Sequence, residues 1–525
     1  MTQRADIVVA GAGHNSLITA AYLARAGYSC IILDARERPG GGAATEEILV
    51  PGLGIDTCST GHTLIRVNPV IKEDELGLVA DHGLTYIDPD PVAHVRLPDG
   101  EHFTMWLDRD RTLAEFARFS PRDAAAYQRM LEEYDAVKHI FGQARFRPLG
   151  HGPTVDELLA GHPRASTWQR RRVMSAFDVV AHEFESRHVQ SFMLWMAFQT
   201  LVSLDRPGSG LLAYSLIYGR QQNSWSIPRG GSGRLVDALV AYLENSGATI
   251  ICNQNVTQLI VEDGRCVGVE TSDGERYLAD KAVVSTIHIK HLVDMAPADL
   301  WGEDFRYGVE TYDVGISGYA AYFGTTEPPV FTISDGGQTA VSAGIAGWPE
   351  QMRRAMRDMS DGVFFEDVPF LLVATPTLVD QSRSVDNLHT VKLLSAQTYQ
   401  LPRGRTWDVE KEIVADRFLE RVQQVAPNFT SDKIIDRHVK SPDDIEAWNA
   451  HMIRGAFHGG DRTIANAGPQ RPVPGWARHR MPIEGLYQTG GTTHPGGSIT
   501  GAPGRNAAMI MLEDLGRDPA EVMRV

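Results

Sequence analysis

The feature that most constrains this chain is its first 34 residues. Residues 7–9 (Ile-Val-Val) form a charge-free β-branched run typical of a buried strand, and the glycine turn 11–16 (Gly-Ala-Gly-His-Asn-Ser) follows. Apolar residues at helical spacing over 17–24 predict a helix that ends near Gly27. A second apolar run, residues 29–33, is closed by Asp34, which lies 23 residues after the first glycine of the turn. Strand, glycine turn, helix, strand and terminal acid together form a dinucleotide-binding fingerprint.

Each part of this fingerprint has a physical role. Gly11 permits the tight turn, and Gly13 lets the backbone approach a pyrophosphate at the helix N-terminus. Asp34 is placed to accept hydrogen bonds from a ribose diol. Ser16 stands where a third glycine or alanine is usual, and we expect its small side chain to pack the helix against the strand.

Composition excludes several classes of protein. With 525 residues, 43% hydrophobic and 22% charged, the chain is long enough for three or four average domains of ordinary globular character. A net charge of −16 argues against a nucleic-acid partner. Four scattered cysteines without a C-x-x-C pair exclude a redox dithiol and a cysteine zinc site, so we expect no metal and a reducing cytoplasm. No signal peptide is expected before the first strand, and the apolar run 189–204 is too short and too polar to span a membrane.

Further segments have the glycine-rich loops and alternating strands and helices that are typical of a nucleotide-binding domain. The loop 36–45 contains three consecutive glycines and follows Asp34 directly, so we expect it to face the same ligand. Residues 228–233 introduce a predicted helix (234–245), a strand (249–252), a hairpin (256–270) and another strand (282–286). Near the end of the chain a strand runs into the glycine-dense loop 490–501, and a helix begins near Pro503. Such a helix start favours an anion, and reduced flavin is one.

Residues 81–215 and 297–455 have a different texture. Predicted strands with turns occupy 84–107, a long helix is predicted over 112–141, and 156–198 is mostly helical. The interleaving predicts two discontinuous domains. Residues 1–80, 216–296 and 456–525 form the nucleotide-binding domain, and the remaining segments, 81–215 and 297–455, form a substrate domain.

These elements, in this order, resemble the phytoene-desaturase-like flavoproteins, which include carotenoid desaturases and isomerases, retinol saturase and pyridine nucleotide-disulfide oxidoreductase domain protein 2. The resemblance covers residues 7–45, 229–285 and 471–508, and its most specific part is T-H-P-G-G-x-x-x-G-x-P-G-x-N-A-A over 493–508. It implies FAD and an α/β fold, in which a Rossmann-like FAD-binding domain of the glutathione-reductase type carries a discontinuous α+β substrate domain. One departure is Gly491, which stands where many relatives have an acid.

The resemblance and the motifs together predict the residues that bind FAD, with the backbone of Val256 meeting the adenine. These residues are Gly11, Gly13, His14, Asn15, Ser16, Asp34, Ala35, Arg36, Gly41, Gly42, Ala43, Val256, Gly490, Gly491, Pro495, Gly496, Gly497, Ile499 and Asn506.

Two features allow more than one interpretation. His494 lies in the loop expected at the flavin, where it is a candidate catalytic residue, although an orienting hydrogen bond to the loop backbone is the more common role. The apolar cluster 192–198 could line a tunnel for an apolar substrate, but such clusters more often form ordinary core.

Three functions remain open from the sequence. The first is an FAD-dependent oxidoreductase that desaturates, saturates or isomerises a C–C bond of a hydrophobic, isoprenoid-like or polyene-like substrate, with hydride transfer at flavin N5. The second is an FAD oxidase or dehydrogenase of a C–N or C–O bond in a small molecule, and the third is a non-catalytic flavin-binding protein. Because only one dinucleotide unit is recognised, electrons are expected to pass to oxygen, a quinone or another soluble acceptor. Peripheral contact with a membrane and the oligomeric state stay open.

Overall fold

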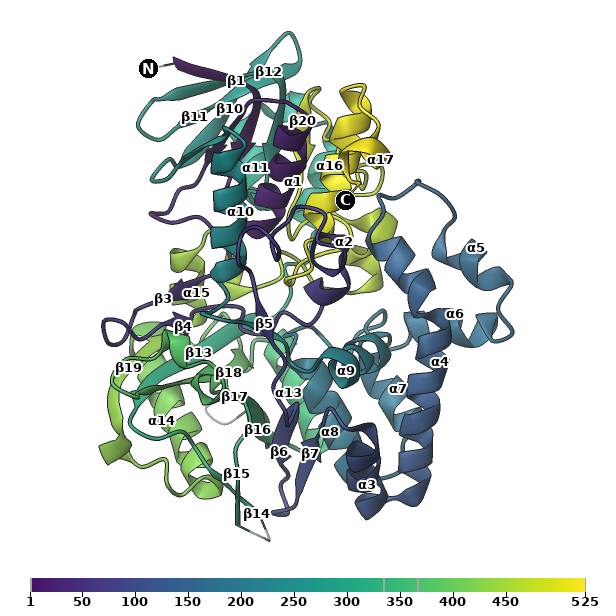
Figure 1. The fold of residues 1–525 in the computed structure, drawn as a ribbon, viewed down its shortest axis with the longest axis vertical. Helices are drawn as coiled ribbons and strands as arrows, with labels where there is room; N and C mark the ends of the chain where they lie inside the picture. Colours follow the sequence, from purple (N-terminus) through teal and green to yellow (C-terminus); the bar gives the residue numbers. More distant parts are fainter. Residues whose placement is uncertain (1, 334–335, 366–367, 525) are drawn as a thin grey trace.

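Two large β-sheets, stacked along the long axis of the molecule, organise the fold (Figure 1). The structure is a computed structural model that describes residues 2–333, 336–365 and 368–524. Each large sheet has seven strands. The first sheet lies beside both chain termini, and the second occupies the opposite half of the molecule (Figure 1).

The first sheet has a parallel part with the strand order β20–β12–β1–β2–β9, and the hairpin β10–β11 extends it antiparallel to β12. Its strands are β1 (Thr2–Ala10), β2 (Cys30–Leu33), β9 (Thr249–Ile251), β10 (Val256–Glu262), β11 (Arg265–Thr271), β12 (Arg276–Ser285) and β20 (Leu486–Gln488). In β1, Ile7 and Val9 pack on one face while Val8 and Ala10 pack on the other. Burial of both faces explains why this run carries no charge.

Helices cover both faces of the first sheet. The helices α1 (His14–Arg25), α10 (Arg234–Asn245) and α16 (Ala502–Asp514) pack on the face that carries Ile7. The opposite face is covered by α11 (Ile289–Leu292) and α12 (Glu303–Glu310). This arrangement confirms the predicted α/β fold with a Rossmann-like domain.

The second sheet is mostly antiparallel, with the order β19–β13–β18–β17–β16–β6–β7. Its strands are β6 (Ala93–Arg96), β7 (His102–Met105), β13 (Ser317–Thr325), β16 (Ser342–Ala346), β17 (Phe370–Ala374), β18 (His389–Gln397) and β19 (Ile434–Lys440). Tyr319, Ala321 and Phe323 of β13 point into a large core, whereas the alternate residues face the first domain. The helices of this core are α3 (Arg109–Phe119), α4 (Pro121–Arg145), α5 (Val155–Ala160), α6 (Ala165–Val173), α7 (Ala176–Glu183), α8 (Arg187–Phe198), α9 (Leu212–Asn223), α13 (Pro349–Ser360) and α14 (Trp407–Val425).

Shorter elements connect these layers. The strand pairs β3 (Thr45–Glu46) with β4 (Ile55–Asp56) and β5 (Tyr86–Ile87) with β8 (Ile227–Pro228) lie between the two halves, and β14 (Phe331–Ile333) pairs with β15 (Gly336–Gln338). The remaining α-helices are α2 (Pro69–Lys72), α15 (Pro442–Trp448) and α17 (Pro519–Val522). Among the described residues, no helix is long and apolar enough to cross a membrane.

Two predicted domain boundaries and one predicted helix differ from the structure. The boundary at residue 216 falls inside α9, whose apolar face packs in the core of the second sheet. The boundary at 296 is too early, because Trp301 and α12 pack on the first sheet. The single helix predicted over 112–141 is two helices. Ser120 ends α3 and caps α4, its hydroxyl accepting a hydrogen bond from the Asp123 amide at 3.1 Å.

Candidate functional site

A cavity of about 830 Å³ lies between the two sheets, near the upper end of the usual range for ligand pockets. The turns that follow β1, β2 and β12 line it from one side, and residues 199–201 after α8, the helix α9 and the second sheet line it from the other. The carboxyl ends of parallel strands therefore face the cavity, where α/β folds bind ligands.

Two glycines shape the first turn in different ways. Gly11 has a φ of +98°, and a Cβ there would lie 2.5 Å from Thr286 Cγ2. Gly13 is the N-cap of α1 and has an ordinary φ of −73°, and a Cβ there would meet no atom within 4 Å. No side chain caps this helix, so its first N–H groups face open cavity space. These N–H groups could donate to the pyrophosphate of a dinucleotide, and the absence of a Cβ at Gly13 leaves space for it.

Asp34 closes β2 and lines the same end of the cavity. Its Oδ2 accepts the Ala12 amide and its Oδ1 accepts the Arg36 amide, both at 2.9 Å. The Gln254 amide donates to the Asp34 carbonyl at 2.8 Å, which brings the start of β10, including Val256, beside this carboxylate. Each carboxylate oxygen keeps a lone pair that could accept a ribose hydroxyl.

The C-terminal glycine loop forms another wall of the cavity through Gly490, Gly491, Gly497 and Ile499. Arg471, fully buried, holds this loop against the segment 458–466, a role that the sequence motifs did not predict. Its guanidinium donates to the carbonyls of Gly491 (3.1 Å from Nε), Asp461 and Asn466 (both 2.9 Å), Gly460 (3.2 Å) and His458 (3.3 Å).

Fourteen of the predicted FAD contacts line the cavity. They are Gly11, Gly13, His14, Asn15, Asp34, Ala35, Arg36, Gly41, Gly42, Val256, Gly490, Gly491, Gly497 and Ile499. Five others support the walls instead: Ser16, Ala43, Pro495, Gly496 and Asn506. Ser16 Oγ lies 2.5 Å from the Gly11 carbonyl and bonds within the turn, and Asn506 Nδ2 donates to the Arg145 carbonyl at 3.0 Å.

His494 is not among the residues that line the cavity. Its Nε2 lies 2.9 Å from the Ala144 carbonyl near the end of α4, so its partner is a neighbouring helix and not the loop backbone. Burial lowers the pKa of His494 to about 4, so the ring is neutral near pH 7. In this placement the ring joins the C-terminal loop to the end of α4.

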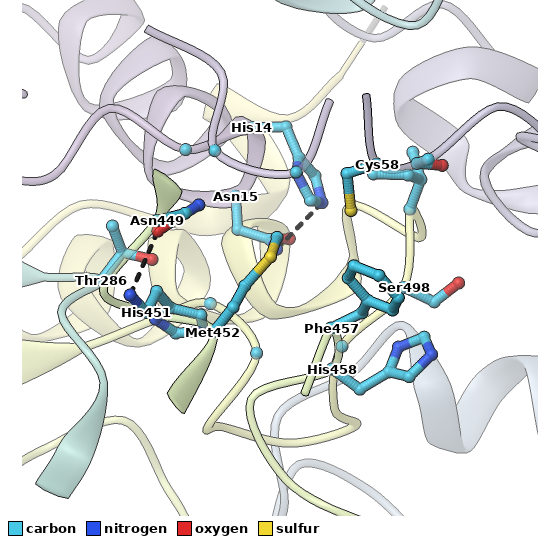
Figure 2. A pocket seen from close by; sticks show the side chains of 18 of the residues that line it. His14, Asn15, Cys58, Thr286, Asn449, His451, Met452, Phe457, His458 and Ser498 are labelled. Atoms are coloured by element: carbon cyan, nitrogen blue, oxygen red, sulfur yellow. Dashed lines mark hydrogen bonds between the residues drawn. The ribbon is translucent and has the colours of Figure 1, made fainter. Parts of the chain in front are cut away.

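Other histidines do line the cavity. His14 comes from α1, and His451 and His458 come from the segment after α15 (Figure 2). His288 precedes α11 and His291 lies within it. Burial lowers the pKa to about 4 for His14 and His451 and to about 3 for His458. His288, His451 and His458 were not predicted, because no local motif marks them and only the tertiary fold brings them to the site.

The far end of the cavity is formed by the substrate half of the molecule. Leu372 of β17 pairs with Leu394 of β18, and Lys392 lies two residues before Leu394, so these three side chains share one face. From the apolar run 189–204 only residues 199–201 reach the cavity. The cluster 192–198 is buried in the second core, so the core interpretation is confirmed and the tunnel interpretation is wrong.

Charge is distributed unevenly along this cavity. Among the described residues that line it, the carboxylates are Asp34 and Asp294, and Asp294 lies in a turn that packs against β10 near Val256. The far end carries Arg220 and Lys392 instead. Lys392 Nζ donates to the carbonyls of Asp56 (3.1 Å) and Cys58 (2.8 Å) and to Thr60 Oγ1 (2.6 Å), and burial lowers its pKa to about 8.

Metal binding has no comparable basis in the structure. Over the described ranges, no group of three or more His, Cys, Asp or Glu side chains is placed to hold a metal ion.

Comparison with known proteins connects this site to a family. The chain is 26% identical to one of the subunits of limonene dehydrogenase from Castellaniella defragrans (98% of this chain, 95% of that protein). It is 27% identical to pyridine nucleotide-disulfide oxidoreductase domain-containing protein 2 of Mus musculus (97% and 94%) and 25% identical to the lycopene-forming phytoene desaturase of Pantoea ananas (97% and 99%).

Solved structures share the fold. Putrescine oxidase bound to putrescine aligns with a TM-score of 0.63 at 14% identity, over 98% of this chain and 100% of that one. Cyclohexylamine oxidase from Brevibacterium oxydans aligns with a TM-score of 0.61 at 15% identity, over 98% and 100%. Residues 17–308 match the family described as flavin containing amine oxidoreductase. The chain therefore belongs to this family, with phytoene-desaturase-like relatives, and is an FAD-dependent oxidoreductase.

Proposed function

We propose that this enzyme acts on a C–C bond of a hydrophobic substrate that carries no positive charge, by desaturation, saturation or isomerisation. The observation that carries the proposal is the far end of the cavity, which is lined by Leu201, Leu216, Leu372 and Leu394 together with two basic side chains. No carboxylate among the described lining residues lies at that end. An ammonium group entering there would lose its hydration without a counter-charge.

The opposite end of the cavity is suited to the cofactor. We assign the N-terminus of α1 at Gly13 to the pyrophosphate of FAD, Asp34 to the ribose and the backbone of Val256 to the adenine, because all three line one continuous cavity. FAD bound there supplies an acceptor for a hydride. The chain itself contributes apolar side chains that orient the substrate, and histidines that are uncharged at neutral pH.

The names of relatives favour the same class of reaction. Limonene dehydrogenase and phytoene desaturases are named for apolar isoprenoids, and each matches almost the whole of this chain. The amine oxidases share the fold at 15% identity or less, which supports no substrate assignment. For the electrons, oxygen, a quinone or another soluble acceptor remains our proposal.

The test is anaerobic mixing of the oxidised holoenzyme with two groups of compounds. One group is limonene and phytoene in detergent micelles, and the other is putrescine, cyclohexylamine and benzyl alcohol. Loss of flavin absorbance with the first group supports desaturation, and a rearranged product without lasting bleaching supports isomerisation. Rapid bleaching by an amine or the alcohol alone would overturn the proposal in favour of C–N or C–O oxidation.

A further inference from the structure

Arg220 is the unexplained charge of the cavity. It lies on α9, its side chain lines the far end, and the residue is only 3% exposed. Its Nη1 donates to Gln199 Oε1 at 2.6 Å and contacts Met196 Sδ at 3.6 Å. Its Nε is buried with no hydrogen-bond partner, and no ion pair joins Arg220 to a carboxylate of the described residues. A buried guanidinium in this condition is energetically unfavourable.

Other buried arginines of the chain are compensated. Arg383 pairs with Asp56 at 2.8 Å and with Asp380 at 3.1 Å, and Arg505 pairs with Glu75 at 2.8 Å. Arg171 likewise contacts two glutamates, both at 2.7 Å. The fold thus supplies carboxylates to these three arginines, whereas the buried Arg471 donates to five backbone carbonyls instead. In the part of the chain that the structure describes, Arg220 contacts neither a carboxylate nor such a set of carbonyls.

The neighbours of Arg220 hold it in place without neutralising it. Gln199, at the end of α8, also accepts a hydrogen bond from Ser342 Oγ at 3.2 Å. This second bond orients the Gln199 side-chain amide, whose oxygen accepts the hydrogen bond from Arg220 Nη1. Lys392, the other cation at this end, already donates to three oxygens of the chain. Arg220 is therefore the basic side chain with hydrogen-bonding capacity to spare, and apolar side chains of Leu201, Leu216 and Trp225 line the cavity with it.

From this arrangement we infer that Arg220 binds a carboxylate of the substrate, so that the substrate class is a hydrophobic carboxylic acid. The substrate carboxylate would accept hydrogen bonds from the free guanidinium N–H groups, as Asp56 and Asp380 do for Arg383. The apolar part of the substrate would lie against Leu201, Leu216 and Trp225. This inference rests on the proposed function, because it identifies the polar end of the substrate whose apolar part is oxidised.

The experiment measures binding to the FAD-loaded enzyme by calorimetry, with decanoate, decanol and decyltrimethylammonium as probes of equal chain length. We expect decanoate to bind at least about tenfold more tightly than decanol, and the cation to bind most weakly. Arg220→Met should remove this preference, while Arg220→Lys should retain part of it. Arg66→Met, which removes a positive charge that does not line the cavity, is the matched control and should leave the affinity for decanoate unchanged.

Stability separates a binding role from a structural one. Because Arg220 has no carboxylate partner, Arg220→Met without ligand should unfold at the same temperature as the wild type or higher, and decanoate should raise the midpoint of the wild type only. Unchanged decanoate affinity in Arg220→Met, or equal affinity of the wild type for decanol, would overturn the inference. Release of FAD from Arg220→Met would do so too, because the arginine would then serve the cofactor. Amine oxidation in the anaerobic assay, with decanoate binding intact, would refute the proposed function and leave this anion site standing.

Discussion

At the scale of single residues, the two glycines of the first turn should respond differently to the same substitution. Gly13→Ala adds a Cβ that meets no atom of the chain within 4 Å and keeps an allowed backbone conformation. We therefore expect the unfolding free energy of the apoprotein to stay within about 0.5 kcal/mol of the wild-type value. The same methyl group would enter the space assigned to the pyrophosphate, so FAD affinity should fall. Gly11→Ala should instead destabilise the fold itself, because its φ is +98° and its Cβ would clash with Thr286. Thermal unfolding of apoprotein and fluorescence titration with FAD measure both effects, and equal FAD affinity of Gly13→Ala and wild type would contradict the assignment.

Asp34 is a second residue whose replacement tests the cofactor assignment. Asp34→Ala removes the acceptor for the Ala12 and Arg36 amides and for the ribose, and we expect FAD binding to weaken by about 1–3 kcal/mol. Asp34→Glu should weaken it less, because a carboxylate is retained. Asp280→Ala, which removes an exposed carboxylate paired with Arg4, is the control and should not change FAD binding. FAD retention by Asp34→Ala equal to that of the wild type would show that the ribose lies elsewhere.

At the scale of elements, substitutions in α8 test whether this helix belongs to the core or lines a substrate tunnel. Phe192 is fully buried and stacks on Phe103 with a centroid distance of 4.0 Å. Phe192→Ala should therefore cost about 3–5 kcal/mol of unfolding free energy and leave the flavin spectrum unchanged. Arg187→Ala, on the exposed side of the same helix, should cost at most about 1 kcal/mol. Denaturant unfolding and absorbance spectra check both variants, and a changed spectrum in Phe192→Ala would place this helix nearer the cofactor than the structure does.

The elements that could be predicted from sequence are those specified by local patterns. The helix α10 begins and ends where Gly233 and the apolar periodicity place it, and β10 and β11 form the hairpin that was predicted over 256–270. Most of the nucleotide end of the cavity follows from such motifs. The far end does not, because Arg220 and Lys392 come from unrelated elements that only tertiary packing brings together. Ser120-Pro121, by contrast, is a local helix-start signal, and it accounts for the break between α3 and α4 that the prediction of one long helix lacked.

At the scale of the whole molecule, buried neutral histidines make stability depend on pH. Burial lowers the pKa to about 4 for His14, His451, His479 and His494, and to about 3 for His62, His94 and His458. Between these values and 6.5 the unfolded chain binds more protons than the folded one, so stability falls as the pH falls through that window. We expect a loss of about 1 kcal/mol for each such histidine between about pH 7.5 and about pH 5.5.

Thermal unfolding of the holoenzyme across this range measures the effect. His62→Gln should flatten the dependence, because it removes one buried imidazole whose Nε2 lies 2.7 Å from Ser232 Oγ. His139→Gln, at an exposed position of α4, should leave the dependence as in the wild type. A midpoint that stays constant between about pH 7.5 and about pH 5.5 would contradict the neutral, buried state of these rings.

The packing of α1 against α16 also has a consequence for biosynthesis. Thr19 of α1 bonds the carbonyl of Gly504, which is 485 residues further along the chain. At about 5–20 residues per second, roughly 25–100 s of translation separate these two partners. During that interval the nascent first strand and helix lack the element that covers them, and apolar surface stays available to chaperones. Capture of FAD is thus expected to be among the last events in the maturation of the enzyme, after the ribosome has released residues 490–508.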